Sequence, residues 1–206
     1  MNTLSKLTRS QFFSSLVYRA RFYRAILASG FDVSETSRID AIHKALKIPS
    51  GYSKNGMSFQ RETRDLVSLR CGLNGEPRLL TSAAAEKLTE LQISARTSGV
   101  TIGVKWAFRS YEDQARLIRA RMLEGRTLES LLSWIAVPGY SEHHTGEAVD
   151  FETYPKDASF ESTDAYYWLN KNAEKFDFFM SYPEGGNAGI IWEPWHWRYR
   201  SDHEVS

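Results

Sequence analysis

Hydrophobic residues recur at two spacings along the chain, and these spacings predict where helices and strands form. Between Thr81 and Gly99 they recur every three or four positions, which is typical of an amphipathic helix. Thr81 or Ser82 can cap the start of this helix, and Gly99 can end it. Its apolar face is formed by Ala84, Leu88, Leu91 and Ala95.

Strands are indicated by runs of aromatic and β-branched residues that turn-forming residues separate. In the run at residues 147–151, alternate side chains face opposite sides of the strand. Asp150 therefore lies on the face opposite to Val149 and Phe151. The predicted strands are residues 66–69, 100–108 (buried), 147–151, 178–182 and 189–199, and residues 72–77 form a turn.

The remaining helices follow from capping residues and from helical spacing. Ser110 and Asp113 have the spacing of a capping box, so we expect a helix that begins after Ser110 and stops at Gly125. Strands and helices are interspersed without regular alternation, which predicts an α+β fold with a small, mostly antiparallel sheet flanked by helices. The other predicted helices are residues 34–46, 127–136 and 163–176.

An N-terminal helical extension, residues 1–55, is predicted to precede a main domain of residues 56–206. Residues 1–31 combine apolar positions at near-helical spacing with five basic residues and no acidic one. Three interpretations of this segment stay open: a helix packed on the domain, a basic helix in peripheral contact with anionic lipid, or a cleaved signal peptide. The short apolar stretch, residues 12–18, is followed by arginines, so no clear signal peptide is present.

Composition narrows the class of protein. The 206 residues are 42% hydrophobic and 25% charged, which is ordinary for a soluble globular domain. A net charge of +1 argues against a nucleic-acid partner. Cys71 is the only cysteine, which excludes an intramolecular disulfide and a zinc site built from several cysteines.

Histidine and aspartate side chains in two segments are candidate ligands for a metal ion. The adjacent His143 and His144 precede Asp150, and His196 lies near the end of the chain. Imidazole nitrogen and carboxylate oxygen both suit Zn²⁺, and three such ligands leave a fourth position open. Spacing alone does not decide between the two adjacent histidines.

Glu193 is the candidate base that takes the proton of the attacking water, because it lies three residues before His196. In a regular strand these two side chains would face opposite sides of the sheet. Pro194 between them cannot donate to a strand ladder and predicts a kink. The kink would bring both side chains to the same side.

Three segments of the chain resemble a known family. They read aromatic-Arg-Ser-x-x-x-Gln at residues 108–114, Ser-x-His-x-x-Gly-x-Ala-x-Asp at residues 141–150 and Glu-x-Trp-His at residues 193–196. Together they resemble the VanY-type D-alanyl-D-alanine carboxypeptidases, which share a zinc peptidase fold with the hedgehog signalling domain. The resemblance covers roughly residues 60–200.

The resemblance implies that Zn²⁺ is the only cofactor and that His143, Asp150 and His196 hold it at the sheet. His144 is then a neighbour of the site rather than a ligand. It also implies that Glu193 is the catalytic base. His43 lies far from these motifs, and we interpret it as a structural histidine.

Three further site residues have two interpretations each. Within its motif Arg109 is expected to be catalytic, stabilising the negative charge on the peptide carbonyl oxygen, although an arginine at a strand end is often only an ion-pair partner. Gln114 is either a substrate-binding residue or a helix-surface amide. Ser141 is either a substrate contact or a loop cap.

The function that the resemblance implies is hydrolysis of a D-Ala-containing bond in peptidoglycan stem peptides or muropeptides, with release of terminal D-alanine. Such a substrate places the protein in the bacterial cell envelope or periplasm. Two alternatives stay open: a lytic peptidoglycan endopeptidase and a non-enzymatic, zinc-stabilised binding module. Glu193 and Arg109 argue against the module, because a purely structural metal site does not need a base beside an open position.

Overall fold

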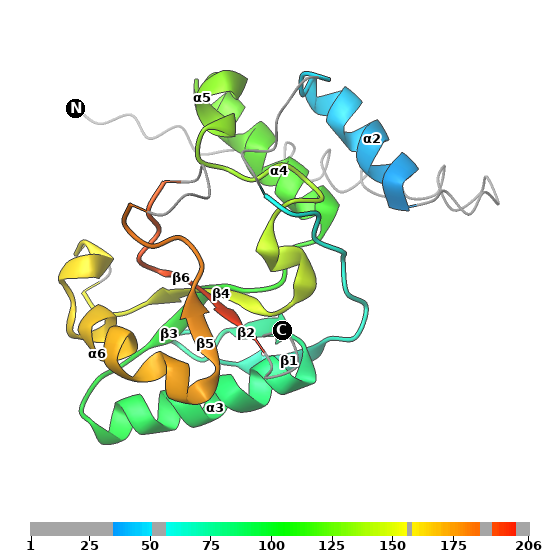
Figure 1. The fold of residues 1–206 in the computed structure, drawn as a ribbon. Helices are drawn as coiled ribbons and strands as arrows, with labels where there is room; N and C mark the ends of the chain where they lie inside the picture. The colour runs from blue at the N-terminus through cyan, green and yellow to red at the C-terminus, as the bar shows by residue number, and fades with distance from the viewer. Residues whose placement is uncertain (1–34, 51–56, 156–157, 186–190, 201–206) are drawn as a thin grey trace, which may run out of the picture. The chain divides into compact units, whose positions relative to one another are not determined.

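Four short antiparallel strands form the central sheet of the computed structural model, in the order β3-β4-β6-β5 (Figure 1). Their bounds are Gly103–Trp106 for β3, Ala148–Glu152 for β4, Phe178–Met180 for β5 and His196–Tyr199 for β6. A separate hairpin pairs β1 (Val67–Arg70) with β2 (Pro77–Leu80). The structure describes residues 35–50, 57–155, 158–185 and 191–200.

Pairing of β4 with β6 at the centre of the sheet determines which residues become neighbours. Asp150 pairs with His196, and Val149 pairs with Trp197. On the other edge of β4, Asp150 pairs with Trp106 of β3, next to an irregularity in the register. Candidate ligands that lie far apart in the sequence therefore lie on adjacent strands.

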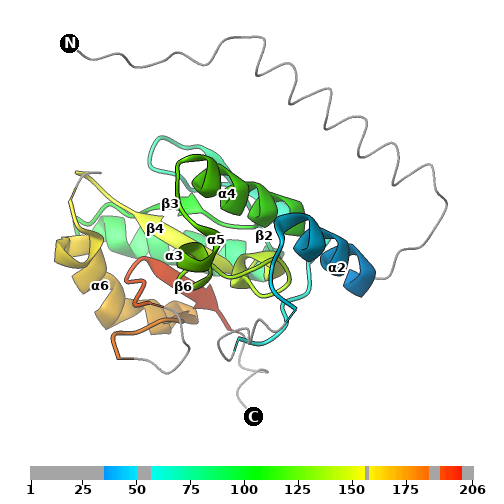
Figure 2. The same ribbon diagram turned by 90° about the horizontal axis from the view of Figure 1, so that it is seen from above.

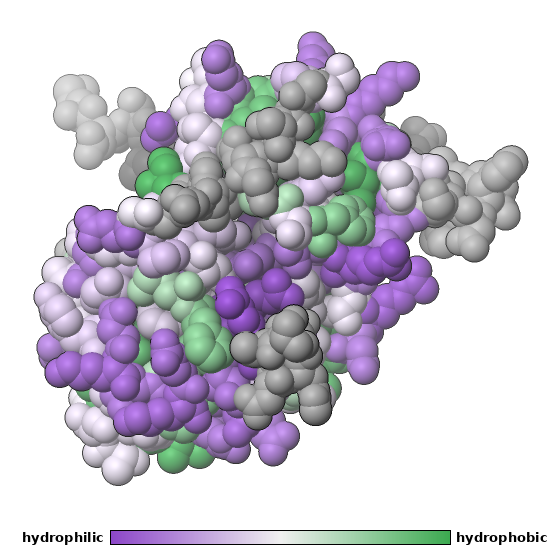
Figure 3. Space-filling view, in the orientation of Figure 1, coloured by the Kyte–Doolittle hydropathy of each residue, from purple (hydrophilic) through white to green (hydrophobic). Residues whose placement is uncertain are grey.

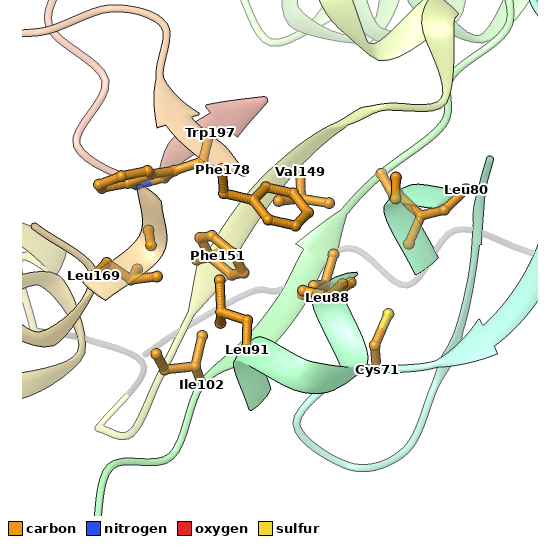
Figure 4. Packing of buried hydrophobic residues seen from close by; sticks show 14 of the residues in the cluster. Cys71, Leu80, Leu88, Leu91, Ile102, Val149, Phe151, Leu169, Phe178 and Trp197 are labelled. Atoms are coloured by element: carbon orange, nitrogen blue, oxygen red, sulfur yellow. The ribbon is translucent and has the colours of Figure 1, made fainter. Parts of the chain in front are cut away.

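The main hydrophobic core lies between the sheet and two helices, α3 (Ser82–Thr97) and α6 (Asp164–Asn172). Figure 4 shows Val149 and Phe151 of β4 pointing toward the same cluster as Leu88 of α3. Because strand residues alternate between faces, the neighbour Asp150 points away from this core. One face of β4 thus anchors the strand while its other face carries a charged side chain.

A second hydrophobic cluster joins α4 (Tyr111–Leu123), α5 (Leu128–Leu132) and the later part of α2 (Glu35–Leu46). Figure 2 shows α4 and α5 from above. Leu46 is buried in this cluster with Ala115 and Ile118 of α4. Residues from Ile39 onward form one compact unit, so this half of α2 packs within the main body of the chain. The division into domains at residue 55 stays a prediction.

Several predicted elements are confirmed, with their caps. The helix at residues 82–97 is capped by Thr81, whose side chain accepts a hydrogen bond from the Ala84 N–H. The helix after Ser110 is capped by that serine, which accepts from the Asp113 N–H. The α+β class with a small antiparallel sheet is also confirmed.

Other boundaries were wrong. The strand predicted at 189–199 is a strand only from His196 onward, because residues 194–195 form a turn; residues 186–190 lie outside the described part. The strand predicted at 100–108 is limited to Gly103–Trp106, and Trp106 is 53% exposed rather than buried. The helix predicted at 127–136 covers only Leu128–Leu132, and β2 was missed because Pro77 was assigned to a turn.

Short 3-10 helices connect the main elements: η2 (Glu142–Thr145), η3 (Phe160–Ser162) and η4 (Ala173–Phe176). On the face in Figure 3, hydrophobic side chains of the described residues lie in separate patches between hydrophilic ones. Within those residues, no helix has the length and apolar character that a membrane crossing requires. The helix and the membrane contact predicted for residues 1–31 lie outside the described residues.

Leu88 is fully buried in the main core, whereas Ile93 on the same helix α3 is 59% exposed. We expect Leu88→Ala to lower the free energy of unfolding by about 2–5 kcal/mol, because it leaves a cavity among packed side chains. Ile93→Ala, with a comparable loss of atoms, should change it by less than about 1 kcal/mol. Urea denaturation of both variants measures the difference, and equal losses would contradict the assigned core.

Candidate active site

The residues predicted to bind a metal lie on three connected elements. His143 is in η2, Asp150 is in β4, and His196 begins β6. Gly146 ends η2 in the left-handed conformation with φ of 72°, and this turn directs the chain into β4. Only a residue without a Cβ adopts this conformation readily, so the glycine fixes how η2 meets the strand.

Three candidate donors converge at one point. The ligand atoms of His143, Asp150 and His196 all lie within 4.8 Å of one another. His143 Nε2 lies 3.3 Å from Asp150 Oδ2, and His196 Nδ1 lies 2.9 Å from Asp150 Oδ1. All three side chains are buried. Two imidazole nitrogens and a carboxylate oxygen at this spacing are a donor set that suits Zn²⁺.

Two carboxylates contact the ring of His196. Asp150 contacts Nδ1, and Glu142 Oε2 lies 2.9 Å from Nε2. Burial lowers the pKa of His196, but the hydrogen bonds to Asp150 and Glu142 outweigh it and raise this pKa to about 10. Without a metal, the positive ring offsets the charge of the carboxylates. Burial raises the pKa of the Asp150 carboxyl, but the two histidines lower it well below its usual range.

Glu142 is a site residue that the sequence reasoning did not single out. Burial raises its pKa, but its contact with His196 outweighs this and holds the pKa at about 2, so the group is ionised. One indication of a role for Glu142 was present in the sequence, which is its position next to His143. That position is variable in the motif, so it did not mark Glu142 as a site residue. No rule of spacing connects Glu142 with His196, which lies 54 residues later.

His144 is held by two hydrogen bonds and is not free to bind a metal. Its Nδ1 lies 2.6 Å from the backbone oxygen of Arg109, and its Nε2 accepts a hydrogen bond from the Gly139 N–H at 3.1 Å. The Nδ1 atom therefore carries the hydrogen. These contacts make His144 a buried link between the metal-binding segment and the end of β3.

Glu193 lies beside the candidate ligands, as the predicted kink requires. The His196 N–H donates to the Glu193 carbonyl oxygen at 3.0 Å, which closes a tight turn over Pro194 and Trp195. Glu193 Oε2 lies 3.9 Å from His196 Nδ1. Burial raises the pKa of Glu193 to about 7, so this carboxyl can both accept and return a proton near neutrality.

Arg109 faces the same space from the segment after β3. Its Nη1 donates to Gln114 Oε1 at 2.8 Å, and its guanidinium lies 5.9 Å from the centroid of the Trp106 ring. The Gln114 amide donates in turn to the Ala136 carbonyl oxygen at 2.5 Å. Gln114 is buried, which is not the environment of a helix-surface amide. The guanidinium is thus held in place from two sides.

An open cleft of about 1020 Å³ is lined by the three candidate ligands and by Arg109, Gln114, Glu142 and Glu193, whereas His144 lies outside its lining. Ser141 lies in its wall; it precedes η2 but makes no side-chain capping bond there. The half-exposed Trp106 and Trp195 line the cleft as well. Beyond the site, the cleft continues along α4, past Arg116 and Ala120 (and also Leu117 and Arg121).

A segment before the motifs, residues 60–63, supports the site from behind. The Gln60 N–H donates to the Gly139 carbonyl at 2.8 Å, and the Thr63 N–H donates to the His144 carbonyl at 3.0 Å. The hydroxyl of Tyr111 donates to the Gln60 carbonyl at 3.1 Å and accepts from the Glu62 N–H at 2.8 Å. Residues 60–63, called the supporting segment below, hold the loop that carries both histidines.

Comparison with known proteins identifies related chains. Residues 77–202 match the family model described as VanY, D-alanyl-D-alanine carboxypeptidase. A D-alanyl-D-alanine carboxypeptidase of Enterococcus faecalis is 31% identical over 122 residues, which are 54% of this chain and 45% of that protein. The putative carboxypeptidase YodJ of Bacillus subtilis is 28% identical over 130 residues, 60% of this chain and 47% of that one. The chain thus spans less than half the length of these relatives.

Solved structures resemble the fold. The LdcB LD-carboxypeptidase superposes with a TM-score of 0.60 and 27% identity, covering 68% of this chain and 70% of that one. A Zn(II) complex of the vancomycin resistance D,D-pentapeptidase VanY superposes with a TM-score of 0.53 and 26% identity. It covers 76% of this chain and 84% of that one.

Gly146 and Gly75 both have φ of 72°, but only Gly146 is closely surrounded. A Cβ at Gly146 would lie 2.7 Å from Leu66 Cδ2 and 3.0 Å from Thr63 Cγ2, whereas a Cβ at Gly75 meets nothing within 4 Å. We expect Gly75→Ala to cost about 1–2 kcal/mol of stability from backbone strain alone. Gly146→Ala should cost at least about 1 kcal/mol more, because the neighbours must shift. Chemical denaturation compares the variants, and equal costs would contradict the packing around η2.

Proposed function

Because the chain belongs to the VanY family of D-alanyl-D-alanine carboxypeptidases, we propose that it is a zinc-dependent carboxypeptidase acting on peptidoglycan stem peptides. The bond that is cut joins a D-alanine residue to the rest of the stem peptide, and terminal D-alanine is the released product. The observation that carries the proposal is the convergence of three metal-type donors with Glu193 and Arg109 in one open cleft. A binding module would need neither the base nor the guanidinium.

The metal would be held by His143, Asp150 and His196, whose donor atoms already converge. A zinc ion bound there supplies a Lewis acid, which lowers the pKa of water and polarises the scissile carbonyl. The related VanY structure that contains Zn(II) supports this choice of metal. The geometry of the three side chains requires no rearrangement of the backbone to form the site.

Glu193 acts as the general base and then as the general acid. Its carboxylate takes a proton from the attacking water and later gives a proton to the leaving amine. In the metal-free protein, burial raises the pKa of this carboxyl to about 7, so the apolar surroundings make it a stronger base than an exposed glutamate. The short turn at Pro194 keeps the carboxylate on the side of the donors.

Arg109 stabilises the carbonyl oxygen of the scissile bond as negative charge develops on it. Its hydrogen bond to Gln114 fixes the guanidinium before the substrate arrives, so little ordering is needed during the reaction. Gln114 retains a second amide hydrogen and Ser141 a hydroxyl. Both residues lie in the cleft wall, and we assign them contacts with the substrate backbone.

The substrate class is supported by the related structures. One is a complex of VanYB with D-alanine-D-alanine, and the structure of the LdcB LD-carboxypeptidase concerns peptidoglycan recognition. A peptidoglycan fragment, as stem peptide or muropeptide, is therefore the proposed partner, and the cell envelope or periplasm is the proposed location. The neighbours include both an LD-carboxypeptidase and a D,D-pentapeptidase, so the products of defined stem peptides distinguish the two bonds.

An endopeptidase is the second candidate, because the cleft continues along α4 beyond the site. Mass spectrometry of products from defined tetrapeptide and pentapeptide stems separates these activities. Loss of one alanine from the pentapeptide indicates a D,D bond, and loss from the tetrapeptide an L,D bond. Cleavage inside a stem or cross-bridge would replace the carboxypeptidase proposal with the endopeptidase.

Substitution of the two adjacent histidines tests the metal site. We expect His143→Ala to lose tightly bound zinc, whereas His144→Ala should keep about one zinc per chain despite lower stability, because both ring nitrogens of His144 bind backbone groups. Affinity for zinc in the wild type should fall in mild acid, as protons compete for the histidines. Elemental analysis after dialysis measures the content, and the reverse result would refute the ligand assignment.

Glu193→Gln tests the catalytic base. The substitution keeps the size of the side chain and removes its capacity to take a proton, so zinc content and folding should be unchanged. Hydrolysis of a D-Ala-ending stem peptide should fall by about 10²–10⁴-fold. Single-turnover rates and zinc content are measured on the same samples. A fully active glutamine variant would falsify the assigned mechanism, and a wild type that binds zinc and stem peptide without cleaving it would favour the binding module.

A further inference from the structure

The imidazole of His196 has a carboxylate at each of its two nitrogens. Asp150 Oδ1 lies 2.9 Å from Nδ1, and Glu142 Oε2 lies 2.9 Å from Nε2. We infer that Glu142 is a positioning residue for the metal site: it selects the tautomer of His196 in which Nε2 carries the hydrogen and Nδ1 faces the metal. The inference rests on the zinc site of the proposed function.

The chemistry of the two groups supports this selection. A neutral imidazole has a hydrogen on one nitrogen and a lone pair on the other. An ionised carboxylate can only accept a hydrogen bond, so Glu142 favours the hydrogen on Nε2. Asp150 accepts from Nδ1 in the same way in the metal-free protein. A metal that replaces the hydrogen on Nδ1 would meet the lone pair of that atom, while the hydrogen on Nε2 stays with Glu142. Carboxylates that contact the outer nitrogen of a ligand histidine commonly have this role in metal sites.

Glu142 is a partner of the ligand rather than a ligand itself. The donor atoms that lie within 4.8 Å of one another belong to His143, Asp150 and His196, and Glu142 is not part of this group. It contacts Nε2, whereas Asp150, a member of the group, contacts Nδ1. To reach the metal, it would have to leave the position that it occupies beside the ring.

Arg198 forms a long ion pair with Glu142 beside His196. It follows His196 by two residues in β6, so both side chains lie on one side of the strand. Its Nη1 lies 3.8 Å from Glu142 Oε1, and its Nε and Nη2 bind Glu147 Oε2 at 3.2 and 2.9 Å. Glu142 also begins η2, the element that carries His143. One carboxylate therefore links the positions of both histidine ligands.

The test measures zinc affinity of the full chain by competition with a chromophoric chelator at fixed pH. We expect Glu142→Ala to weaken zinc binding by about 10–100-fold. Glu142→Gln should weaken it less, because the amide oxygen still accepts from Nε2 but without charge. The control is Glu161→Gln, which removes the same charge from the cleft wall and has no contact with the ring. The control should stay within about twofold of the wild type.

A second measurement does not depend on the variants. Long-range ¹H–¹⁵N correlation spectra of the zinc-loaded wild type should show a hydrogen on Nε2 of His196, with Nδ1 bound to the metal. A hydrogen on Nδ1 would overturn the inference, even if Glu142→Ala did not fold. Unchanged zinc affinity in a folded Glu142→Ala protein would overturn it as well. Complete loss of zinc from a folded Glu142→Gln protein would make Glu142 a ligand and also contradict the inference.

These outcomes are separate from failure of the proposed function. If the wild type binds no zinc, the metal proposal itself fails. If the wild type binds zinc and cleaves stem peptides while the Glu142 variants bind zinc equally well, only the positioning role fails.

Discussion

The antiparallel pairing of β4 with β6 is the constraint on which the site depends. This register sets Asp150 opposite His196, and the same two strands contribute Val149 and Trp197 to the core. A shift of one residue would turn Asp150 toward the core and Val149 toward the cleft. The energy of burying the apolar face therefore also determines which carboxylate meets which histidine.

Electrostatics of the cleft follow from this arrangement. Asp150 and His196 are both buried, and either of them alone would be costly to remove from water. Each is stabilised by the other, and His196 is stabilised further by Glu142. A divalent cation between the donors would take over the role that the proton on His196 has in the metal-free protein. The charges of the site thus agree with the proposed cation at this point.

Much of this could be predicted from the sequence, and the exceptions have physical causes. Local signals determined the helix starts at Thr81 and Ser110, because capping depends on residues within one turn. The kink at Pro194 was also predictable, since proline cannot continue a strand ladder. Glu142 was not, because its partner is remote in sequence and only the folded sheet brings them together. The site roles of Arg109, Gln114 and Ser141 stay predictions until variants are measured.

The supporting segment has a consequence for where the functional unit begins. It lies before residue 77, at which the match to the family model starts, yet its backbone binds the loop that carries both histidines. Residues that lie before the family match therefore support the site through their backbone contacts, although they carry none of its motifs. A shortened chain cut at the edge of the matched region would keep the three metal donors and Glu193 while losing the part that holds their loop. In this protein the match to the family model begins inside the cooperative structure rather than at its boundary.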